Sequence, residues 1–361
     1  MRRLVYPLMG SLALTACSAE TPDDDTTPGT EAPESTGTPV PESASPTPVD
    51  EPQGDGYYAP LPDPTTALAA AVLHDKLYTY GGTTESAHIE NNEVFISEIR
   101  RLDLNDPDAE WETIAGPDMP IQQAGLFVYK ERLYRLGGLI ALNPPEEDAD
   151  LWSVADFAVY DEATDTWTSL PDMPDTRSSN SIGIHDGVLY VMGGWKMEGG
   201  SDSWTYYDTW LSIDLEADPM VWEEHEQPFQ VRDHCGGVKD GKVYLIGGML
   251  SGYFPSEPYV YDIASGEWST GPELPIDHPY KGFGCASAVV DGELYFSGID
   301  GVVYRLKDDH GGWEAVDYLN PARSFHAMPA RGSGELIAVG GGTGNEIDAI
   351  DLVESILLDG R

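Results

Sequence analysis

The sequence is poor in basic residues. Of 361 residues, 19 are lysine or arginine and 63 are aspartate or glutamate, which gives a formal net charge of -44. Nucleic-acid binding depends on a basic stripe that neutralises phosphates. Anionic membrane surfaces also repel a chain of this charge. We therefore expect no nucleic-acid partner and no direct membrane contact by the folded part of the chain.

Several motifs of catalysis and cofactor binding are missing as well. The sequence has no P-loop, no zinc-ligand spacing, no nucleophile elbow and no dinucleotide-binding fingerprint. It holds three cysteines and no apolar stretch long enough for a transmembrane helix. We expect no cofactor and no metal site.

The first 17 residues are typical of a targeting segment. Arg2 and Arg3 precede a mostly apolar stretch at 4–16, which is too short to span a bilayer and ends in Leu14-Thr15-Ala16-Cys17. This resembles a bacterial lipoprotein signal, in which the cysteine, here Cys17, is lipidated and becomes the first residue. An ordinary secretory signal with an incidental cysteine is the alternative. The expected location is the cell envelope of a bacterium, on a membrane facing the periplasm or the outside.

Residues 18–56 form a linker of low complexity. Serine, threonine, proline and acidic residues dominate this stretch, and it contains no lysine or arginine. Such a composition buries too little apolar surface to fold, and prolines and like charges extend it. We predict a disordered acidic tether between the lipid anchor and a folded domain at 57–361.

The domain is built from repeats of one pattern. His185 to Gly194 reads as a polar turn, a short apolar strand and a pair of glycines. The first glycine of each copy falls at Gly81, Gly137, Gly193, Gly247, Gly298 and Gly340, with steps of 56, 56, 54, 51 and 42. Paired glycines are needed where φ is positive or where another backbone comes too close for a Cβ atom. The spacing indicates a repeat architecture.

Further marks follow most glycine pairs in a fixed order. An apolar residue and an aspartate occur at Leu102-Asp103, Tyr160-Asp161, Ile213-Asp214, Tyr261-Asp262 and Ile350-Asp351. A tryptophan comes next in four copies, at Trp111, Trp167, Trp222 and Trp268, and a proline turn leads into the next copy. Copy five keeps a tryptophan, Trp313, but has Arg305 in place of the aspartate, and copy six lacks the tryptophan.

This set of marks resembles the kelch repeat, whose period is about 50 residues. The resemblance implies an all-β fold, a six-bladed kelch-type β-propeller with four antiparallel strands per blade. The strand before each polar turn is expected to be innermost. Two segments are open as the strand that closes blade six: 354–358, or the N-terminal residues 57–59.

Two sets of loops are expected at one end of the propeller channel. The post-glycine loops follow each glycine pair, and the lead-in loops precede each inner strand. Aromatic and cationic residues recur in them and could form a ligand-binding mouth for an acidic sugar, a glycan or an acidic peptide. The alternative is structural, because kelch repeats often hold an arginine and a histidine at this phase. The predicted ligand-binding residues are Arg177, Arg232, His234, Lys281, Arg323, His326, Trp195, Trp204 and Tyr207.

Cys235 and Cys285 occupy nearly the same phase in neighbouring repeats. An exported protein favours a disulfide, provided that the Cα atoms come within about 7 Å. Two buried free thiols are the alternative. A copper-radical oxidase, another function of kelch propellers, would need a Tyr-Cys crosslink and histidine ligands, and His234-Cys235 is only a faint match.

Two functions remain open, because a fold does not dictate a function. The first is a lipid-anchored binding or scaffold module, expected to be monomeric, that holds a protein or glycan at its loop face. The second is an enzyme, since exported six-bladed kelch propellers include sialic acid mutarotases. That activity would depend on Arg177, Arg232, His234 and Arg323, and on a carboxylate or histidine as the acid or base.

Overall fold

The computed structural model describes residues 56–86, 89–344 and 347–358. The predicted targeting segment with Cys17 and nearly all of the predicted linker lie outside these residues. Within them, the strands form six four-stranded antiparallel sheets. The first three, in chain order, are β2 (Ala69–Leu73), β3 (Lys76–Tyr80), β4 (Ile99–Asp103) and β5 (Glu112–Ile114); β7 (Gly125–Tyr129), β8 (Arg132–Leu136), β11 (Phe157–Asp161) and β12 (Thr166–Ser169); and β13 (Ser181–His185), β14 (Val188–Met192), β17 (Thr209–Asp214) and β18 (Trp222–Glu226).

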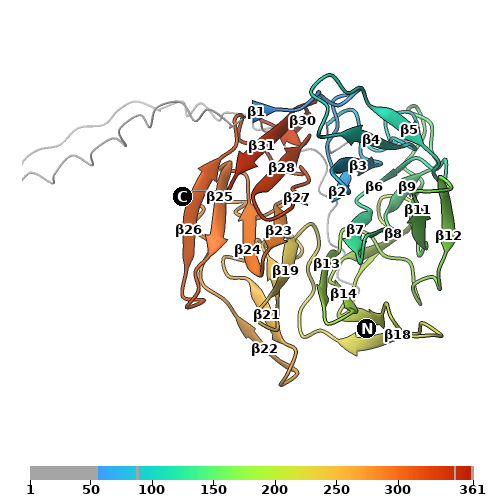
Figure 1. The fold of residues 1–361 in the computed structure, drawn as a ribbon. Helices are drawn as coiled ribbons and strands as arrows, with labels where there is room; N and C mark the ends of the chain where they lie inside the picture. Colours follow the sequence, from blue (N-terminus) through green and yellow to red (C-terminus); the bar gives the residue numbers. More distant parts are fainter. Residues whose placement is uncertain (1–55, 87–88, 345–346, 359–361) are drawn as a thin grey trace, which may run out of the picture. The chain divides into compact units, whose positions relative to one another are not determined.

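The other three sheets complete a ring of blades (Figure 1). They are β19 (Cys235–Lys239), β20 (Lys242–Ile246), β21 (Tyr259–Asp262) and β22 (Glu267–Thr270); β23 (Ala286–Val290), β24 (Glu293–Ser297), β25 (Val302–Leu306) and β26 (Trp313–Tyr318); and β27 (Ala330–Arg331), β28 (Glu335–Val339), β31 (Val353–Leu357) and β1 (Gly56–Tyr57). The first strand of each blade lies at the centre and the fourth at the edge. The prediction of a six-bladed propeller is confirmed.

The N-terminal strand closes blade six. β1 pairs with β31, with Gly56 opposite Ser355 and Tyr57 opposite Glu354. β31 is therefore the third strand of this blade and not its outer strand. The expected aspartate mark, Ile350-Asp351, precedes this strand. In blade one the aspartate, Asp103, pairs with the first residue of the second strand. In blade six Leu357 holds that position, opposite Glu335 at the start of β28. A short hairpin, β29 (Gly342–Thr343) with β30 (Asp348–Ala349), follows the glycine pair, and Ile350-Asp351 lies between this hairpin and β31.

A five-stranded sheet lies outside the six blades and was not predicted. Its five strands come from the lead-in loop of blade two and from the post-glycine loops of blades two and three. They are β6 (Ile121–Gln122), β9 (Leu139–Ala141), β10 (Leu151–Ser153), β15 (Trp195–Gly199) and β16 (Trp204–Tyr206). Phe95, from the post-glycine loop of blade one, packs with Leu139, Leu151 and Met197 from this sheet. The loops at this end of the channel therefore have a core of their own.

The glycine pairs join each blade to the next one. A Cβ atom on the first glycine of five copies would lie 2.2–2.7 Å from a carbonyl oxygen of the following lead-in loop. The N–H of the second glycine donates to that same residue in all five, at 2.7–3.1 Å. The accepting residues are Ile121, Arg177, Val231, Gly282 and Thr65. Copy five, which has Ile299 as its second residue, has no such joint among the described residues. The glycines are thus required because two backbones touch there.

The lead-in loops also bond to one another around the channel. At six equivalent positions the backbone is left-handed, and five N–H groups donate to the carbonyl of the equivalent residue in the preceding blade, at 2.7–3.2 Å. The sixth link runs through side chains, from Ser179 Oγ to Gln123 Oε1. The residues are Ala67, Gln123, Ser179, Asp233, Gly284 and Phe325. This ring of hydrogen bonds defines the mouth of the channel.

The tryptophans of the repeat provide a third contact between blades. Trp111, Trp167, Trp222 and Trp313 donate their indole N–H to carbonyl oxygens 41 to 52 residues earlier in the chain, at 2.8–3.2 Å. Each accepting residue lies at or near the end of the preceding blade. The mark that identified the repeat in the sequence therefore ties the outer strands together.

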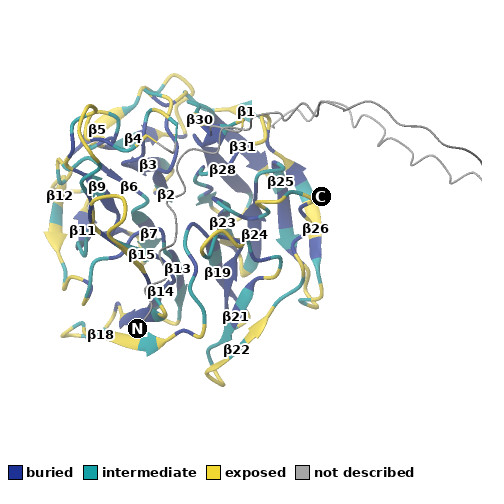
Figure 2. Cartoon of the chain, turned by 180° about the vertical axis from the view of Figure 1, so that it is seen from behind, coloured by how far each residue is buried: buried dark blue, intermediate teal, exposed yellow. Residues whose placement is uncertain are grey.

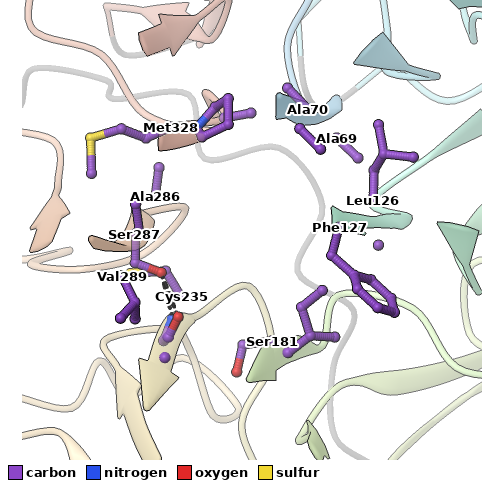
Figure 3. A pocket seen from close by; sticks show the side chains of 18 of the residues that line it. Ala69, Ala70, Leu126, Phe127, Ser181, Cys235, Ala286, Ser287, Val289 and Met328 are labelled. Carbon is purple, nitrogen blue, oxygen red and sulfur yellow. Dashed lines mark hydrogen bonds between the residues drawn. The ribbon is translucent and has the colours of Figure 1, made fainter. Parts of the chain in front are cut away.

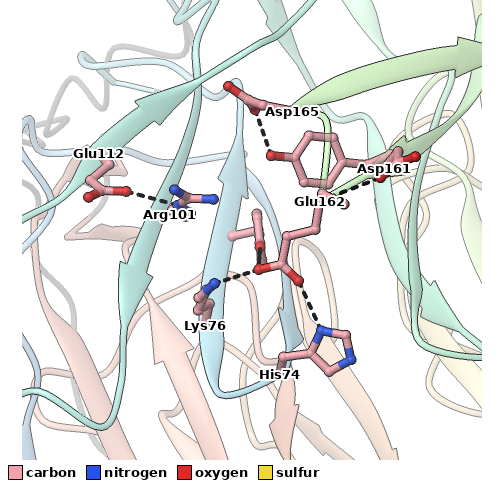
Figure 4. A network of polar contacts seen from close by, with 10 residues as sticks. His74, Lys76, Arg101, Glu112, Asp161, Glu162 and Asp165 are labelled. Carbon is pink, nitrogen blue, oxygen red and sulfur yellow. Dashed lines mark hydrogen bonds and ion pairs between the residues drawn. The ribbon is translucent and has the colours of Figure 1, made fainter.

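Polar side chains link the blades at the end opposite the mouth (Figure 4). Glu162, which follows β11 in blade two, accepts from Lys76 Nζ at 2.5 Å and from His74 Nδ1 at 2.9 Å in blade one. Partial burial alone would raise the pKa of Glu162, but the hydrogen bonds from Lys76 and His74 lower the pKa to about 2. The carboxylate is therefore charged whenever the protein is near neutral pH.

Burial follows the layers of the propeller (Figure 2). The second strands are almost fully buried, as in KLYTY of β3 and VLYVM of β14, and exposed residues gather on the outer strands and loops. In the part of the chain that the structure describes, no helix is long and apolar enough to cross a membrane.

The glycine joint can be tested with Gly247 and a matched glycine. Both Gly247 and Gly241 have positive φ, +67° and +70°, but a Cβ atom would meet the Gly282 oxygen at 2.3 Å at Gly247 and nothing within 4 Å at Gly241. Gly241→Ala should cost about 1 kcal/mol of unfolding free energy for the left-handed backbone alone. Gly247→Ala should cost about 2 kcal/mol more, because the backbones must move apart. Urea unfolding of the full chain measures both, and equal costs would contradict the joint.

Candidate functional site

The inner strands surround one central cavity of about 510 Å³ (Figure 3). Its wall is made of small and apolar residues, among them Ala70, Ser181, Gly236 and Val289. Small side chains leave the centre open where the inner strands converge. The titratable residues of the cavity wall are His234 and His326, which lie at the ends of inner strands.

Two of the predicted ligand-binding arginines are internal. Arg177 is buried and donates from Nη1 to the carbonyl oxygens of Gly193 at 2.6 Å and Thr209 at 2.8 Å. Its guanidinium lies 3.7 Å from the centre of the Tyr207 ring, and burial lowers the pKa of Arg177 to about 10. Arg323 forms an ion pair with Glu354 at 2.9 Å, with both side chains fully buried. Loss of either partner would leave the other charge buried and uncompensated.

The two predicted histidines are internal too. His326 Nε2 lies 2.7 Å from Ser297 Oγ in the preceding blade. His234 packs against the backbone of Gly193. Burial lowers the pKa of each histidine to about 3, so both rings are neutral at physiological pH. The structure thus places Arg177, Arg323, His234 and His326 inside the fold, in contact with protein groups, and both histidines also line the central cavity.

Tyr207 and Lys281 also bond within the fold. Tyr207 is half-buried beneath Arg177, and its hydroxyl donates to the Thr176 carbonyl at 2.7 Å. Lys281 Nζ lies 3.5 Å from the Ile276 carbonyl oxygen and 3.7 Å from Glu273.

Arg232 is the predicted arginine that reaches the mouth. Its guanidinium lies 4.1 Å from the centre of the Trp195 ring, and Nε donates to the Tyr206 hydroxyl at 3.3 Å. Nη1 is paired with the carboxylate of Asp233, a member of the ring of hydrogen bonds. The fold therefore brings together Arg232, Trp195 and Trp204, which the sequence proposed as one site.

Aromatic side chains form a series beside Arg232, which we name the aromatic rim. Four of its members come from the lead-in and post-glycine loops of blades four to six, with ring centres 5.0–5.5 Å apart. Three come from β15 and β16, with ring centres 4.8–6.4 Å apart. The members are Phe325, Phe283, Phe254 and Tyr280, and Trp195, Trp204 and Tyr206. Phe254, Tyr280, Phe283, Phe325 and Tyr206 were not among the predicted site residues.

Glu90 is a functional candidate that the sequence did not reveal. It lies in the post-glycine loop of blade one, where its carbonyl accepts from Asn143 Nδ2 at 3.0 Å. Burial raises the pKa of the Glu90 carboxyl to about 7, while Arg232 lowers and Asp233 raises it. Among the described residues, no hydrogen bond or ion pair holds this carboxylate. In an acidic sequence, only the fold distinguishes it from other glutamates.

Cys235 is the first residue of the inner strand β19, and Cys285 directly precedes the neighbouring inner strand β23. They are joined as a disulfide with Cα atoms 5.5 Å apart. Ser287 bonds the same two strands, since it donates to the Gly236 carbonyl at 2.7 Å and accepts from the Gly236 N–H at 2.8 Å. This interface is fixed just below the mouth. Within the described ranges no group of three metal-binding side chains occurs.

Comparisons with known proteins agree with this fold. Residues 231–275, which span blade four, match the Kelch motif. The Kelch-like protein terF of Aspergillus terreus is 27% identical over 307 residues, which cover 77% of this chain and 61% of that protein. N-(sulfonatooxy)prop-2-enimidothioate sulfolyase of Thlaspi arvense is 28% identical over 190 residues, 49% of this chain and 51% of that protein. Beta-scruin of Limulus polyphemus is 28% identical over 140 residues, 38% of this chain and 14% of its own length.

A solved structure, that of YjhT, superposes with a TM-score of 0.65 at 18% identity and covers 84% of this chain and 98% of that one. At this identity the likeness concerns the fold. The chain spans less than two thirds of the length of each of the three sequence relatives. These findings support a kelch-repeat protein with a kelch-type propeller, a fold that suggests a protein-interaction or scaffold module.

The environment of Glu90 predicts a pH-dependent stability. A carboxyl whose pKa is raised from 4.5 to about 7 on folding stabilises the protein fully below pH 4.5 and loses that contribution as pH rises through 7. Because Glu90 is partly exposed, we expect the loss to be about 2 kcal/mol rather than the full value of the shift. Glu90→Gln should abolish this loss, as measured by urea unfolding at pH 5 and pH 8. Glu93→Gln is the control, and an identical pH profile for Glu90→Gln and the wild-type chain would contradict the prediction.

Proposed function

We propose that this chain is an exported, lipid-anchored kelch propeller that acts as a binding or scaffold module. It holds a protein or glycan ligand at the mouth formed by the post-glycine and lead-in loops. The aromatic rim is the observation that carries this proposal. Aromatic side chains supply large contact areas and are enriched at binding surfaces. Here Trp204 is 44% exposed and Tyr280 50% exposed on the same loop system.

The sequence supports the location. Cys17 stands where a lipoprotein signal places its lipidated residue, and the linker at 18–56 would hold the propeller away from the membrane. Stable anchoring by acyl chains requires more than one chain. In this proposal the protein is a monomer that contacts the membrane through its N-terminal lipid alone and presents the mouth to the periplasm or the outside.

The rim can be tested by capture. Immobilised full-length protein is incubated with solubilised cell-envelope material and with a panel of glycans. The double variant Trp204→Ala/Tyr280→Ala should lose what the wild-type chain retains, because it removes the two most exposed rings of the rim. Trp152→Ala is the matched control. Trp152 is 41% exposed, but its neighbour Leu151 packs in the core under the five-stranded sheet, so the Trp152 side chain points to the opposite face of that sheet. Equal capture by the double variant and the wild type would refute the role of the rim.

A second candidate function is a sugar-modifying enzyme that resembles sialic acid mutarotases. Glu90 favours it, because a carboxyl with a pKa of about 7 is suited to act as a general acid or base at neutral pH. Arg232 is the one of the four arginine and histidine residues predicted for this activity that reaches the mouth.

The enzyme is tested by following the anomers of N-acetylneuraminic acid by NMR. Catalysis by the wild-type chain that Glu90→Gln abolishes, with a pH profile that turns near 7, would establish it. Interconversion at the spontaneous rate would exclude it and leave the binding module.

A further inference from the structure

The aromatic rim forms a nearly continuous series across the mouth. The ring of Phe283 lies 5.1 Å from Phe325 and 5.5 Å from Phe254. The guanidinium of Arg232 connects the two halves of the rim, at 6.0 Å from the Phe283 ring and 4.1 Å from the Trp195 ring. Loops from four different blades thus place aromatic side chains in contact with one another.

The cations of the mouth are already compensated. Among the described lysines and arginines of these loops, Arg232 pairs with Asp233, Lys196 with Asp175 at 3.0 Å and Glu198 at 2.9 Å, and Lys281 with Glu273 at 3.7 Å. Arg177 and Arg323 are buried. An acidic ligand would have to displace these carboxylates and approach a chain with a formal net charge of -44. The charge distribution therefore favours an uncharged occupant.

Exposed carboxylates occur in the same loops as the exposed rings. Asp202 is exposed in the hairpin that carries Trp204, and Asp277 is exposed in the loop that carries Tyr280. Glu198, opposite Trp152 in the register, lies on the other face of that hairpin. Charged residues are depleted at the core of protein–protein interfaces. Hydroxyl groups, in contrast, donate well to carboxylates.

We propose that the aromatic rim binds an uncharged oligosaccharide. The apolar faces of the sugar rings stack on Trp204 and Tyr280, and hydroxyl groups donate to the exposed carboxylates of the same loops. The inference rests on the proposed binding function and specifies its ligand as a neutral glycan rather than an acidic glycan or a protein.

The experiment measures binding by the full-length protein on an array of uncharged oligosaccharides, with cellohexaose, maltohexaose and N-acetylchitohexaose among them. Oligogalacturonate is the acidic probe. We expect at least one uncharged probe to bind, and oligogalacturonate to bind at least tenfold more weakly. Affinity for the bound probe, measured by calorimetry, should fall about three- to tenfold in Trp204→Ala and in Tyr280→Ala, as expected for loss of one aromatic contact. Trp204→Phe should restore most of it, and Trp152→Ala should leave it unchanged.

The possible failures are distinguishable. If oligogalacturonate binds as tightly as the uncharged probes and depends on the rim, the inference is overturned while the binding function stands. If no uncharged probe binds but the rim captures a protein from the cell envelope, the ligand class is again wrong and the function stands. If nothing binds through Trp204 and Tyr280, both the inference and the proposed function fail. Thermal unfolding of each variant verifies that the fold is retained.

Discussion

The fold depends on the contact between each glycine pair and the lead-in loop of the next blade. At Gly81 and Gly247 the backbones are so close that no side chain fits between them. A sheet with an unpaired edge is prone to association with other chains, and closure into a ring of blades leaves only short edges. The same contact fixes the lead-in loops, which then bond to one another around the mouth. Local backbone chemistry in each repeat thus becomes a closed ring.

This closure explains why most of the cationic residues near the mouth serve the fold. A lead-in loop held between two blades has carbonyl groups and side chains that must be satisfied inside the protein. Arg177 bonds to two backbone carbonyls of its own blade, and Arg323 neutralises Glu354 in blade six. In a protein with few lysines and arginines, these roles leave Arg232 as the arginine whose side chain reaches the solvent side of the mouth.

Differences in loop length between the blades make the mouth asymmetric. Blades two and three extend their post-glycine loops into a five-stranded sheet, whereas the corresponding connection of blade five, between β24 and β25, is short. The mouth is therefore asymmetric, with an added sheet on one side and the rings of blades four to six on the other. Such asymmetry is what a repeat protein needs to recognise one ligand, because the repeats themselves are nearly equivalent. In the same loop system, burial raises the pKa of Glu90 of blade one to about 7, although the charge of Arg232 in blade four lowers it.

The sequence by itself determined the class of fold, the number of blades and the identity of the inner strands, because these follow from local signals that recur with every repeat. The order of glycine pair, aspartate and tryptophan at Gly137, Asp161 and Trp167 is enough to place the strands of a blade. The equal phase of Cys235 and Cys285 left a disulfide and two free thiols open, and the structure shows the disulfide. The sequence did not separate the two strands that could close blade six, nor did it show that Arg177 and Arg323 are buried. It also left Glu90 among many carboxylates. The tertiary structure decided these points, since burial, charge compensation and pKa depend on which loops of different blades meet, and those residues are far apart in the chain.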